Sequence, residues 1–220
     1  MRVPPEQLEQ LIKNIFLGIG CEAEEAACVA EHLVLAAPSG RTSHDAIRLA
    51  IYLQWIREEK VYINRRIEPV SDSGSLFVVD GQMGLGQWTG YQTMLRAIET
   101  CREHGVAIAA LRNSGHLGRI GHWAEMAIAE GFVSLHFVNS TGLGMRVVPA
   151  GGIDSRMSIN PITVGFPIPG QTPFVLDIAA AMTAEGKLKV SRNKGELVPD
   201  GLIIDAEGRP TNDPNAFYGP

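Results

Sequence analysis

The chain has 220 residues, of which 45% are hydrophobic and 20% are charged, and its formal net charge at pH 7 is −5. Such a composition is typical of an ordinary globular protein, and the length allows one large domain or two small ones. No run of lysine and arginine occurs, so we expect no nucleic-acid partner. No apolar run approaches the roughly 20 residues that cross a bilayer, so we expect no membrane partner.

The first residues predict an amphipathic helix and not a secretory signal. Pro4 and Pro5 open the segment, and large apolar residues then recur at helical spacing until Gly18. The segment lacks the continuous apolar stretch and the cleavage site of a signal peptide. The three cysteines are widely spaced and form no CxxC pair. We therefore expect reduced thiols and a cytoplasmic protein.

Three helices are expected before residue 61, and together they form a small helical unit. The first covers about 5–17 and the second about 22–37. The third is expected from about His44 to residue 60, with Ser43 as its N-cap.

Strands and helices alternate in the middle of the chain. Strands are expected at 75–81, 106–113 and 132–139, and helices at 91–105 and 119–131. This βαβαβ order favours a sheet with helices packed on it. After residue 140 the expected elements are short strands in 161–170 and 173–179, a helix in 183–195, a hairpin-like turn in 201–208 and a loop from 209 to 220.

A glycine-rich segment imitates a dinucleotide-binding loop. Gly84, Gly86 and Gly90 follow a strand with the spacing GxGxxxG, one residue longer than the GxGxxG fingerprint. The loop is expected well before the next helix, and no suitably placed acidic strand end follows. We therefore expect a loop that packs beneath a ligand and not a Rossmann site.

A histidine and an arginine stand four residues apart where the third helix is expected to begin. His44 and Arg48 would then share one helix face. An arginine can hold a carboxylate through two hydrogen bonds, and a histidine can exchange a proton near neutral pH. Ser43 can donate a further hydrogen bond, and a helix N-terminus favours an anion. A 2-keto acid would match these groups, although such a pair is more often a solvated helix start.

Two further histidines lie in the segment "NSGHLGRIGHW". His116 lies in a glycine-rich loop, where the backbone can approach a ligand, so it is the better functional candidate. His122 is expected to be a half-buried helix residue, because a spacing of six fits neither one helix face nor a common zinc motif.

Polar residues also follow two of the expected strands. Asn139 and Ser140 end one strand, and Asp177 ends another, ten residues before Lys187. Strand ends border ligand crevices in α/β sheets. Each position alone is weak evidence, since a buried aspartate often only caps a helix.

Taken together, these segments resemble the malate/L-lactate dehydrogenase family of the sulfolactate, 2,3-diketo-L-gulonate and ureidoglycolate dehydrogenase type. The family pattern reads roughly SHGxxRLxxY, SxHxGxxGxxxxxA, NS, NPxxxGxP, DxAxSxxAxGK and PxGxxxDxxGxPTxDP. The corresponding segments here are SHDAIRLAIY, SGHLGRIGHWAEMA, NS, NPITVGFP, DIAAAMTAEGK and PDGLIIDAEGRPTNDP. The resemblance covers nearly the whole chain, and the combination is more specific than any one segment.

The resemblance implies an α/β fold: a mixed-sheet, non-Rossmann NAD(P)-binding domain with an N-terminal helical unit. Residues 1–75 would form the helical, substrate-side unit, and 76–220 the cofactor-binding domain. The implied activity is hydride transfer between NAD or NADP and a small 2-keto or 2-hydroxy acid. A homodimer with the site near the subunit interface is implied as well.

The resemblance also assigns residues. His44 would exchange the proton, Arg48 would hold the substrate carboxylate, and His116 would complete the catalytic group, with no metal. Substrate contacts would come from Ser43, Arg48 and His116. Cofactor contacts would come from His116, Ser140, Asp177, Ile178, Ala179 and Lys187.

The chain departs from the family pattern in two ways. Asp45 stands where the family has glycine, and its carboxylate would favour a protonated His44 if it faced that ring. We expect it to turn outward as a helix-start acid. The family also continues for roughly a hundred residues beyond the pattern that ends here, so we expect the chain to be incomplete at its C-terminal end.

Three alternatives stay open at this stage. A cyclic imino acid presents the same carboxylate with a C=N bond in place of the ketone. A non-catalytic fragment that only binds ligand fits the missing C-terminal part. A zinc hydrolase using His44, His116 and His122 is the weakest, because no HExxH or HxH pair occurs.

Overall fold

The computed structural model describes residues 3–140 and 145–218. The chain divides into two compact units, Met1–Phe132 (unit 1) and Val133–Pro220 (unit 2), and each is described by itself. The functional division expected after residue 75 stays a prediction, because compactness does not test which segment carries substrate or cofactor. Among the described residues, no helix combines the length and apolarity needed to cross a bilayer.

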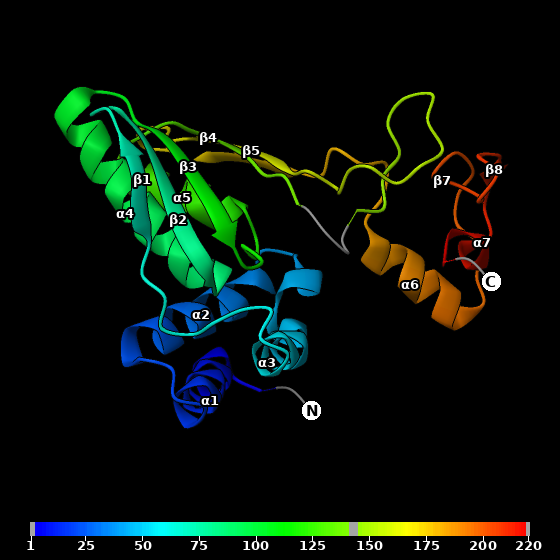
Figure 1. The fold of residues 1–220 in the computed structure, drawn as a ribbon, viewed down its shortest axis with the longest axis horizontal. Coiled ribbons are helices and arrows are strands. Elements are labelled where there is room, and N and C mark those ends of the chain that lie inside the picture. Colours follow the sequence, from blue (N-terminus) through cyan, green and yellow to red (C-terminus); the bar gives the residue numbers. More distant parts are fainter. Residues whose placement is uncertain (1–2, 141–144, 219–220) are drawn as a thin grey trace. The chain divides into compact units, whose positions relative to one another are not determined.

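Two of the expected helices open unit 1. Helix α1 spans Pro5–Gly18 and α2 spans Ala23–Ala36, and the two pack against each other (Figure 1). Pro5 suits the first helical turn because that turn needs no N–H donor. Ile12 and Phe16 are fully buried against α2. Each such side chain stabilises the fold by roughly 1.5–3 kcal/mol.

The third helix begins later than expected. Helix α3 spans Leu49–Arg57, and two short 3-10 turns precede it, Thr42–His44 and Ala46–Arg48. Ser43 is therefore not a helix N-cap, and that prediction was wrong. Asp45 caps the second turn, since its Oδ1 accepts the Ile47 N–H at 2.9 Å. A short acidic side chain that binds the backbone two residues on competes with α-helix and delays its start.

Unit 1 contains a three-stranded mixed sheet in the order β1-β2-β3. Strand β1 (Glu68–Asp72) is antiparallel to β2 (Leu76–Gly84), and β2 is parallel to β3 (Ile108–Ser114). Helix α4 (Gly86–His104) connects the two parallel strands. Strand β1 was not expected from the sequence, because all five of its residues are exposed and it shows no apolar alternation.

Helix α4 begins at Gly86, five residues earlier than expected, so Gly86 and Gly90 lie in the helix and Gly84 ends β2. The predicted glycine-rich loop, and the gap between it and the helix, were wrong. A Cβ on Gly86 would lie 2.3 Å from the backbone oxygen of His116, and one on Gly90 would lie 2.9 Å from the Trp123 ring. These glycines let α4 approach the His116 loop and the next helix, α5 (Gly121–Ala129). The start of α4 therefore packs against the backbone of a candidate site residue.

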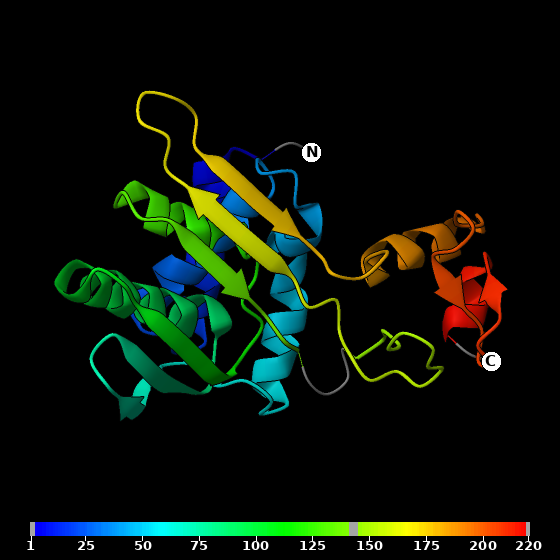
Figure 2. The same cartoon turned by 90° about the horizontal axis from the view of Figure 1, so that it is seen from above.

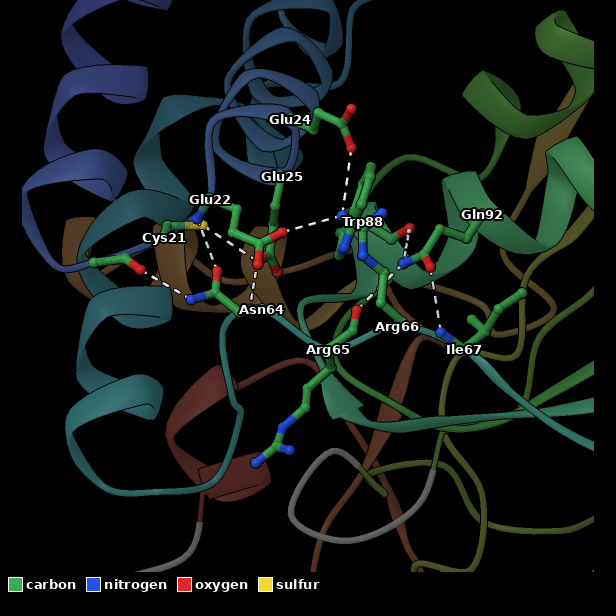
Figure 3. Close-up of polar contacts among 11 residues, drawn as sticks. Cys21, Glu22, Glu24, Glu25, Asn64, Arg65, Arg66, Ile67, Trp88 and Gln92 are labelled. Carbon is green, nitrogen blue, oxygen red and sulfur yellow. Dashed lines mark hydrogen bonds and ion pairs between the residues drawn. The ribbon is translucent and has the colours of Figure 1, made fainter.

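The segment between α3 and β1 is fastened to α2 by a buried polar cluster (Figure 3). The Glu25 Oε2 atom accepts a hydrogen bond from the Cys21 thiol at 3.3 Å and from the Asn64 N–H at 2.5 Å. Arg66 places its guanidinium 4.9 Å from the Trp88 ring on α4. Burial is the main cause that raises the pKa of Glu25, and the Asn64 and Cys21 hydrogen bonds oppose it. The cluster connects α2, α4 and the segment that leads into the sheet.

Unit 2 begins with a separate sheet. Strands β4 (Ser134–Phe137), β5 (Ile162–Phe166) and β6 (Phe174–Ile178) are all antiparallel, and Figure 2 shows β4 in green and β5 and β6 in yellow. The third strand of the expected βαβαβ run therefore starts a second sheet and does not extend the first. Its hydrogen bonds go to β5.

The remainder of unit 2 is a small helical and hairpin region. Helix α6 spans Glu185–Lys194, as expected, and β7 (Ile203–Ile204) pairs with β8 (Pro210–Thr211) across the predicted turn. Helix α7 covers Pro214–Tyr218. The expectation of a loop after residue 208 was wrong within the described residues, because pairing and packing with α6 create order that five-residue patterns do not reveal.

Candidate active site

The two histidines singled out in the sequence lie together in unit 1. The His44 ring, on the first 3-10 turn, stacks on the His116 ring with centroids 5.5 Å apart and an interplanar angle of 15°. The loop between β3 and α5 carries His116. The structure therefore brings together two imidazoles that are 72 positions apart in the chain.

Arg48 joins this pair by a different geometry from the one expected. It lies on the second 3-10 turn, and its Nε donates to the backbone oxygen of Ser43 at 2.6 Å. The Ser43 hydroxyl lies 3.0 Å from His44 Nδ1. The expected sharing of one α-helical face by His44 and Arg48 was wrong, because the Asp45 turn intervenes. The hydrogen bond to Ser43 holds the arginine close to the histidine turn instead.

Two buried side chains that the sequence analysis assigned no role complete the cluster. The Tyr52 hydroxyl lies 2.7 Å from His116 Nδ1, and Gln87 Nε2 donates to that hydroxyl at 2.9 Å. Tyr52 is 1% exposed and Gln87 is fully buried. The available signal was the motif SHDAIRLAIY, in which Tyr52 stands four residues after Arg48.

The surroundings determine the charge of the ring at the centre. Burial, followed by the charges of Arg48 and His44, lowers the pKa of His116 to about 3. Burial raises the pKa of Tyr52 to about 12. At neutral pH both groups are therefore uncharged, and Arg48 supplies a fixed positive charge beside them. Such a group can receive an organic anion next to an imidazole.

The loop that carries His116 is held firmly by its backbone. The Gly115 N–H donates to the Gly84 oxygen at 2.8 Å, and the Arg119 N–H donates to His32 Nε2 at 2.9 Å. Gly118 has a φ of +71°, which glycine adopts without strain. Burial is the main cause that lowers the pKa of His32 to about 2, so its ring stays a neutral acceptor.

The expectation for His122 is confirmed, because it is a half-buried residue of α5. Its ring lies 4.5 Å from that of His32, so the four histidines form two separate pairs. Over residues 3–140 and 145–218, no three metal-ligating side chains converge. A zinc site built from His44, His116 and His122 therefore has no support in the geometry.

Unit 2 carries the other candidate residues. Ser140 is half-buried after β4, Asp177 and Ile178 end β6, and Ala179 follows them; Lys187 is exposed in the first turns of α6. The Asp177 Oδ1 atom accepts a hydrogen bond from the Thr163 hydroxyl at 3.0 Å. Three of these residues are consecutive in the chain, so the strand itself places them together.

A hollow of about 320 Å³ lies beside the ends of β4 and β5. Its lining residues are Phe137, Val138, Asn139, Asn160, Pro161, Ile162 and Ala180. Asn160 has a φ of +39°, and its buried Oδ1 has no hydrogen-bond partner among the described residues. A buried acceptor of this kind is costly unless something donates to it. The hollow therefore offers an acceptor to a ligand that carries an N–H or O–H group.

Comparison with known proteins gives consistent results. A family model described as malate/L-lactate dehydrogenase matches residues 3–219. Hydroxycarboxylate dehydrogenase B of Escherichia coli K12 is 39% identical over 213 residues, which are 97% of this chain and 59% of that protein. An L-lactate dehydrogenase of Cupriavidus necator is 40% identical over 220 residues, which are 100% of this chain and 63% of that protein.

A solved structure shows the same fold. The Δ1-piperideine-2-carboxylate reductase of Pseudomonas syringae pv. tomato has a TM-score of 0.91 and 30% identity, over 99% of this chain and 65% of that one. The chain spans about three fifths of the length of the curated relatives named above. The family match over residues 3–219 spans the histidine, arginine and strand-end positions described above. The chain belongs to the malate/L-lactate dehydrogenase family.

Proposed function

We propose that the chain takes part in hydride transfer between NAD(P)H and a small 2-keto acid, or the reverse oxidation of the 2-hydroxy acid. The observation that carries this proposal is the stacked pair of His44 and His116 with Arg48 held at the same turn. The family membership supports the reaction class, since the relatives named above are hydroxy acid and lactate dehydrogenases.

In this proposal the two histidines have different tasks. His44 is partly exposed and exchanges the proton with the oxygen at the reacting carbon. His116, uncharged because burial and Arg48 lower its pKa, contacts an oxygen of the bound molecule. General acid help of this kind accelerates a reaction by about 10²- to 10⁴-fold.

Arg48 is proposed to bind the substrate carboxylate. Its Nε is engaged by the Ser43 oxygen, which leaves the terminal guanidinium nitrogens to grip an anion. Ser43 is exposed and is proposed to add a hydrogen bond to the same substrate.

The cofactor residues are proposed to lie mainly in unit 2. Ser140, Asp177, Ile178, Ala179 and Lys187 would hold NAD or NADP, with a contribution from His116. The unpaired Oδ1 of Asn160 in the neighbouring hollow fits a group that bears amide and hydroxyl donors. When bound, the nicotinamide supplies or accepts the hydride. Lys187 is exposed and cationic, which suits a phosphate.

The direct test is a kinetic comparison of matched variants in a screen of small keto acids with NADH and NADPH. His44→Gln should lower kcat by at least a hundredfold, whereas His104→Gln, on the exposed end of α4, should leave it unchanged. Arg48→Lys should mainly raise KM for the keto acid. Arg57→Lys, at the exposed end of α3, should leave KM unchanged. Near-parental activity of both site variants would contradict the assignment.

One comparison favours a second substrate class within the same chemistry. The reductase that shares the fold at a TM-score of 0.91 is named for a cyclic imino acid. Such a substrate carries a carboxylate for Arg48 and a C=N bond at the position of the ketone. A panel holding pyruvate-like keto acids and cyclic imino acids separates the two. A chain that binds NADH in a thermal-shift assay but turns over neither class would be a non-catalytic fragment.

We also propose that the chain pairs with a second copy in a reducing compartment. Large apolar side chains on one face of the β4–β5–β6 sheet support pairing, because their exposed fractions are high. They are Leu135 62%, Phe137 74%, Phe166 41%, Phe174 50% and Ile178 48%. Exposed apolar patches of this kind commonly mark interaction sites. The three cysteines are free thiols, which supports a reducing compartment. Sedimentation should give twice the mass of the chain, and a monomer would contradict the pairing.

A further inference from the structure

We propose that Tyr52 and Gln87 are positioning residues that hold His116 as the neutral tautomer with its hydrogen on Nε2, so that His116 only donates a hydrogen bond. The effect on turnover rests on the proposed function, but the tautomer itself does not. The two stacked rings then differ. His116 is confined to one protonation state, and His44 is the ring that exchanges the proton in the proposed function.

The first step is a backbone contact that has only one direction. The Gly118 N–H donates to His116 Nδ1 at 3.3 Å. An amide N–H cannot accept, so Nδ1 must present its lone pair, and in a neutral ring the hydrogen then lies on Nε2. Side-chain amides and hydroxyls leave such directions open, whereas a backbone amide does not.

The second step fixes the tyrosine and the glutamine. Because His116 Nδ1 then carries no hydrogen, the Tyr52 hydroxyl 2.7 Å away donates to it, and the Gly118 N–H shares the same lone pair as the longer and weaker donor. The Tyr52 oxygen then accepts, and Gln87 Nε2 donates to it at 2.9 Å. Tyr52 is 1% exposed and Gln87 is fully buried, so water does not offer either group an alternative partner.

The third step concerns protonation. A proton on Nδ1 would face the Gly118 N–H directly, and the Tyr52 oxygen would accept both from it and from Gln87 Nε2, which leaves the Tyr52 hydrogen without an acceptor among these groups. All these contacts therefore oppose the cationic ring, and the fixed charge of Arg48 adds to the opposition. Burial, followed by the charges of Arg48 and His44, lowers the pKa of His116 to about 3, which acts in the same direction.

His44 lies in the opposite situation. Its Nδ1 lies 3.0 Å from the Ser43 hydroxyl, which can both donate and accept. Ser43 is exposed, so its hydrogen can turn when the ring changes state. Either form of the His44 ring keeps this contact. The Ser43 contact is thus compatible with either form of the His44 ring, whereas the contacts of His116 favour one form.

The test is nitrogen NMR of the 220-residue chain without ligand, with ¹⁵N-labelled histidine and His116→Gln to assign the signals. We expect a pyridine-type Nδ1 and a pyrrole-type Nε2 for His116, unchanged between pH 8 and pH 5. A pyrrole-type Nδ1, or a doubly protonated His116 with a midpoint above pH 5, would overturn the inference. This measurement requires no turnover.

Variants then test the positioning. Tyr52→Phe should expose a fraction of Nδ1-protonated ring, raise the His116 midpoint by about one pH unit and lower kcat roughly tenfold, the usual effect of one hydrogen bond. Gln87→Met should act in the same direction. Tyr91→Phe is the matched control, because Tyr91 packs in the same core against Trp88. An unchanged His116 signal in folded Tyr52→Phe would overturn the positioning role. A correct tautomer without turnover would instead contradict the proposed function alone.

Discussion

In unit 1 the candidate groups are connected across distant parts of the chain, whereas in unit 2 three of them are consecutive in the chain, at the end of β6 and directly after it. Tyr52 and His116 are 64 residues apart and share a hydrogen bond, with Gln87 behind them. In unit 2, Ile178 is 48% exposed at the end of β6. In unit 1 the buried hydrogen bonds among Tyr52, Gln87 and His116 are therefore present without a ligand. In unit 2 the candidate residue Ile178 is exposed at the end of its strand.

The hydrophobic core of unit 1 is also larger than that of unit 2. The main buried cluster of unit 1 joins α1, α2, α3 and α4 and includes Phe16, Leu33 and Trp88. The cluster of unit 2 consists of Leu188, Val198 and Ile203, with a few partly buried neighbours. A residue of the larger cluster is surrounded by more atoms that cannot relax, so unit 1 should respond more strongly to every disturbance.

The largest expected difference is in acid. Burial is the main cause that lowers the pKa of His32 to about 2, of His116 to about 3 and of His122 to about 4 in unit 1. In unit 2 burial lowers the pKa of His136 to about 4. The unfolded chain therefore binds more protons below pH 6.5, and stability is lost as the pH falls. From pH 7 to 5 each histidine should cost about 2 kcal/mol, or about 6 kcal/mol for unit 1.

The chain offers separate probes for this experiment. Its three tryptophans, Trp55, Trp88 and Trp123, all lie in unit 1, so urea titrations followed by fluorescence report that unit. Amide hydrogen exchange in β4–β6 reports unit 2. Glu25 opposes the trend slightly, because its raised pKa favours the folded state in acid. Equal fluorescence midpoints at pH 7 and pH 5 would contradict the assignment of three neutral, buried histidines.

Glycine substitutions sharpen the comparison at the level of single contacts. A Cβ on Gly118 would lie 2.2 Å from His32 Nε2, at a φ of +71°. Gly118→Ala should therefore cost about 4 kcal/mol from overpacking and strain. Gly195 ends α6 with a φ of +69° and nothing within 4 Å, so Gly195→Ala should cost only about 1 kcal/mol. If denaturant titrations gave similar losses of unfolding free energy for the two variants, the His116 loop would be able to shift and accommodate the added Cβ.

Core truncations should give the next effect. Leu33→Ala, at a fully buried position of the large cluster, should cost about 3 kcal/mol. Leu188→Ala should cost about 2 kcal/mol, because the small cluster around it can collapse into the space. Urea titrations read by fluorescence and by exchange measure the two. A larger loss for Leu188 would show that unit 2 is packed more rigidly than its few buried residues indicate.

The sequence predicted what depends on local periodicity. Helices α1 and α2 were expected because apolar residues repeat every three or four positions, and α6 and the β7–β8 turn because of glycine punctuation. The start of α3 was missed because Asp45 binds the backbone locally, a choice that helical spacing does not report.

Only the local part of the candidate site could be predicted, because contacts between distant segments leave no pattern in the sequence. The motif containing His44 and Arg48 identified the right turn, but its contact with His116 is tertiary. Tyr52 stood within that motif without a visible task, since only the fold shows that its hydroxyl meets an imidazole 64 residues away. Gln87 lies in the glycine-rich segment that resembled a dinucleotide loop, and its burial carries no sequence signal.

The smallest expected effect concerns the residue that departs from the family pattern at the site itself. Asp45 accepts the Ile47 N–H at 2.9 Å, so Asp45→Ala should lose a cap and cost about 1 kcal/mol. Asp45→Asn keeps the acceptor and should be near parental, and Asp45→Gly should cost only a few tenths of a kcal/mol. Urea titrations read by tryptophan fluorescence, to which Trp55 on α3 contributes, measure the stability of all three variants. If Asp45→Ala instead tightened binding of a keto acid with stability unchanged, the carboxylate would act on the substrate and not on the turn.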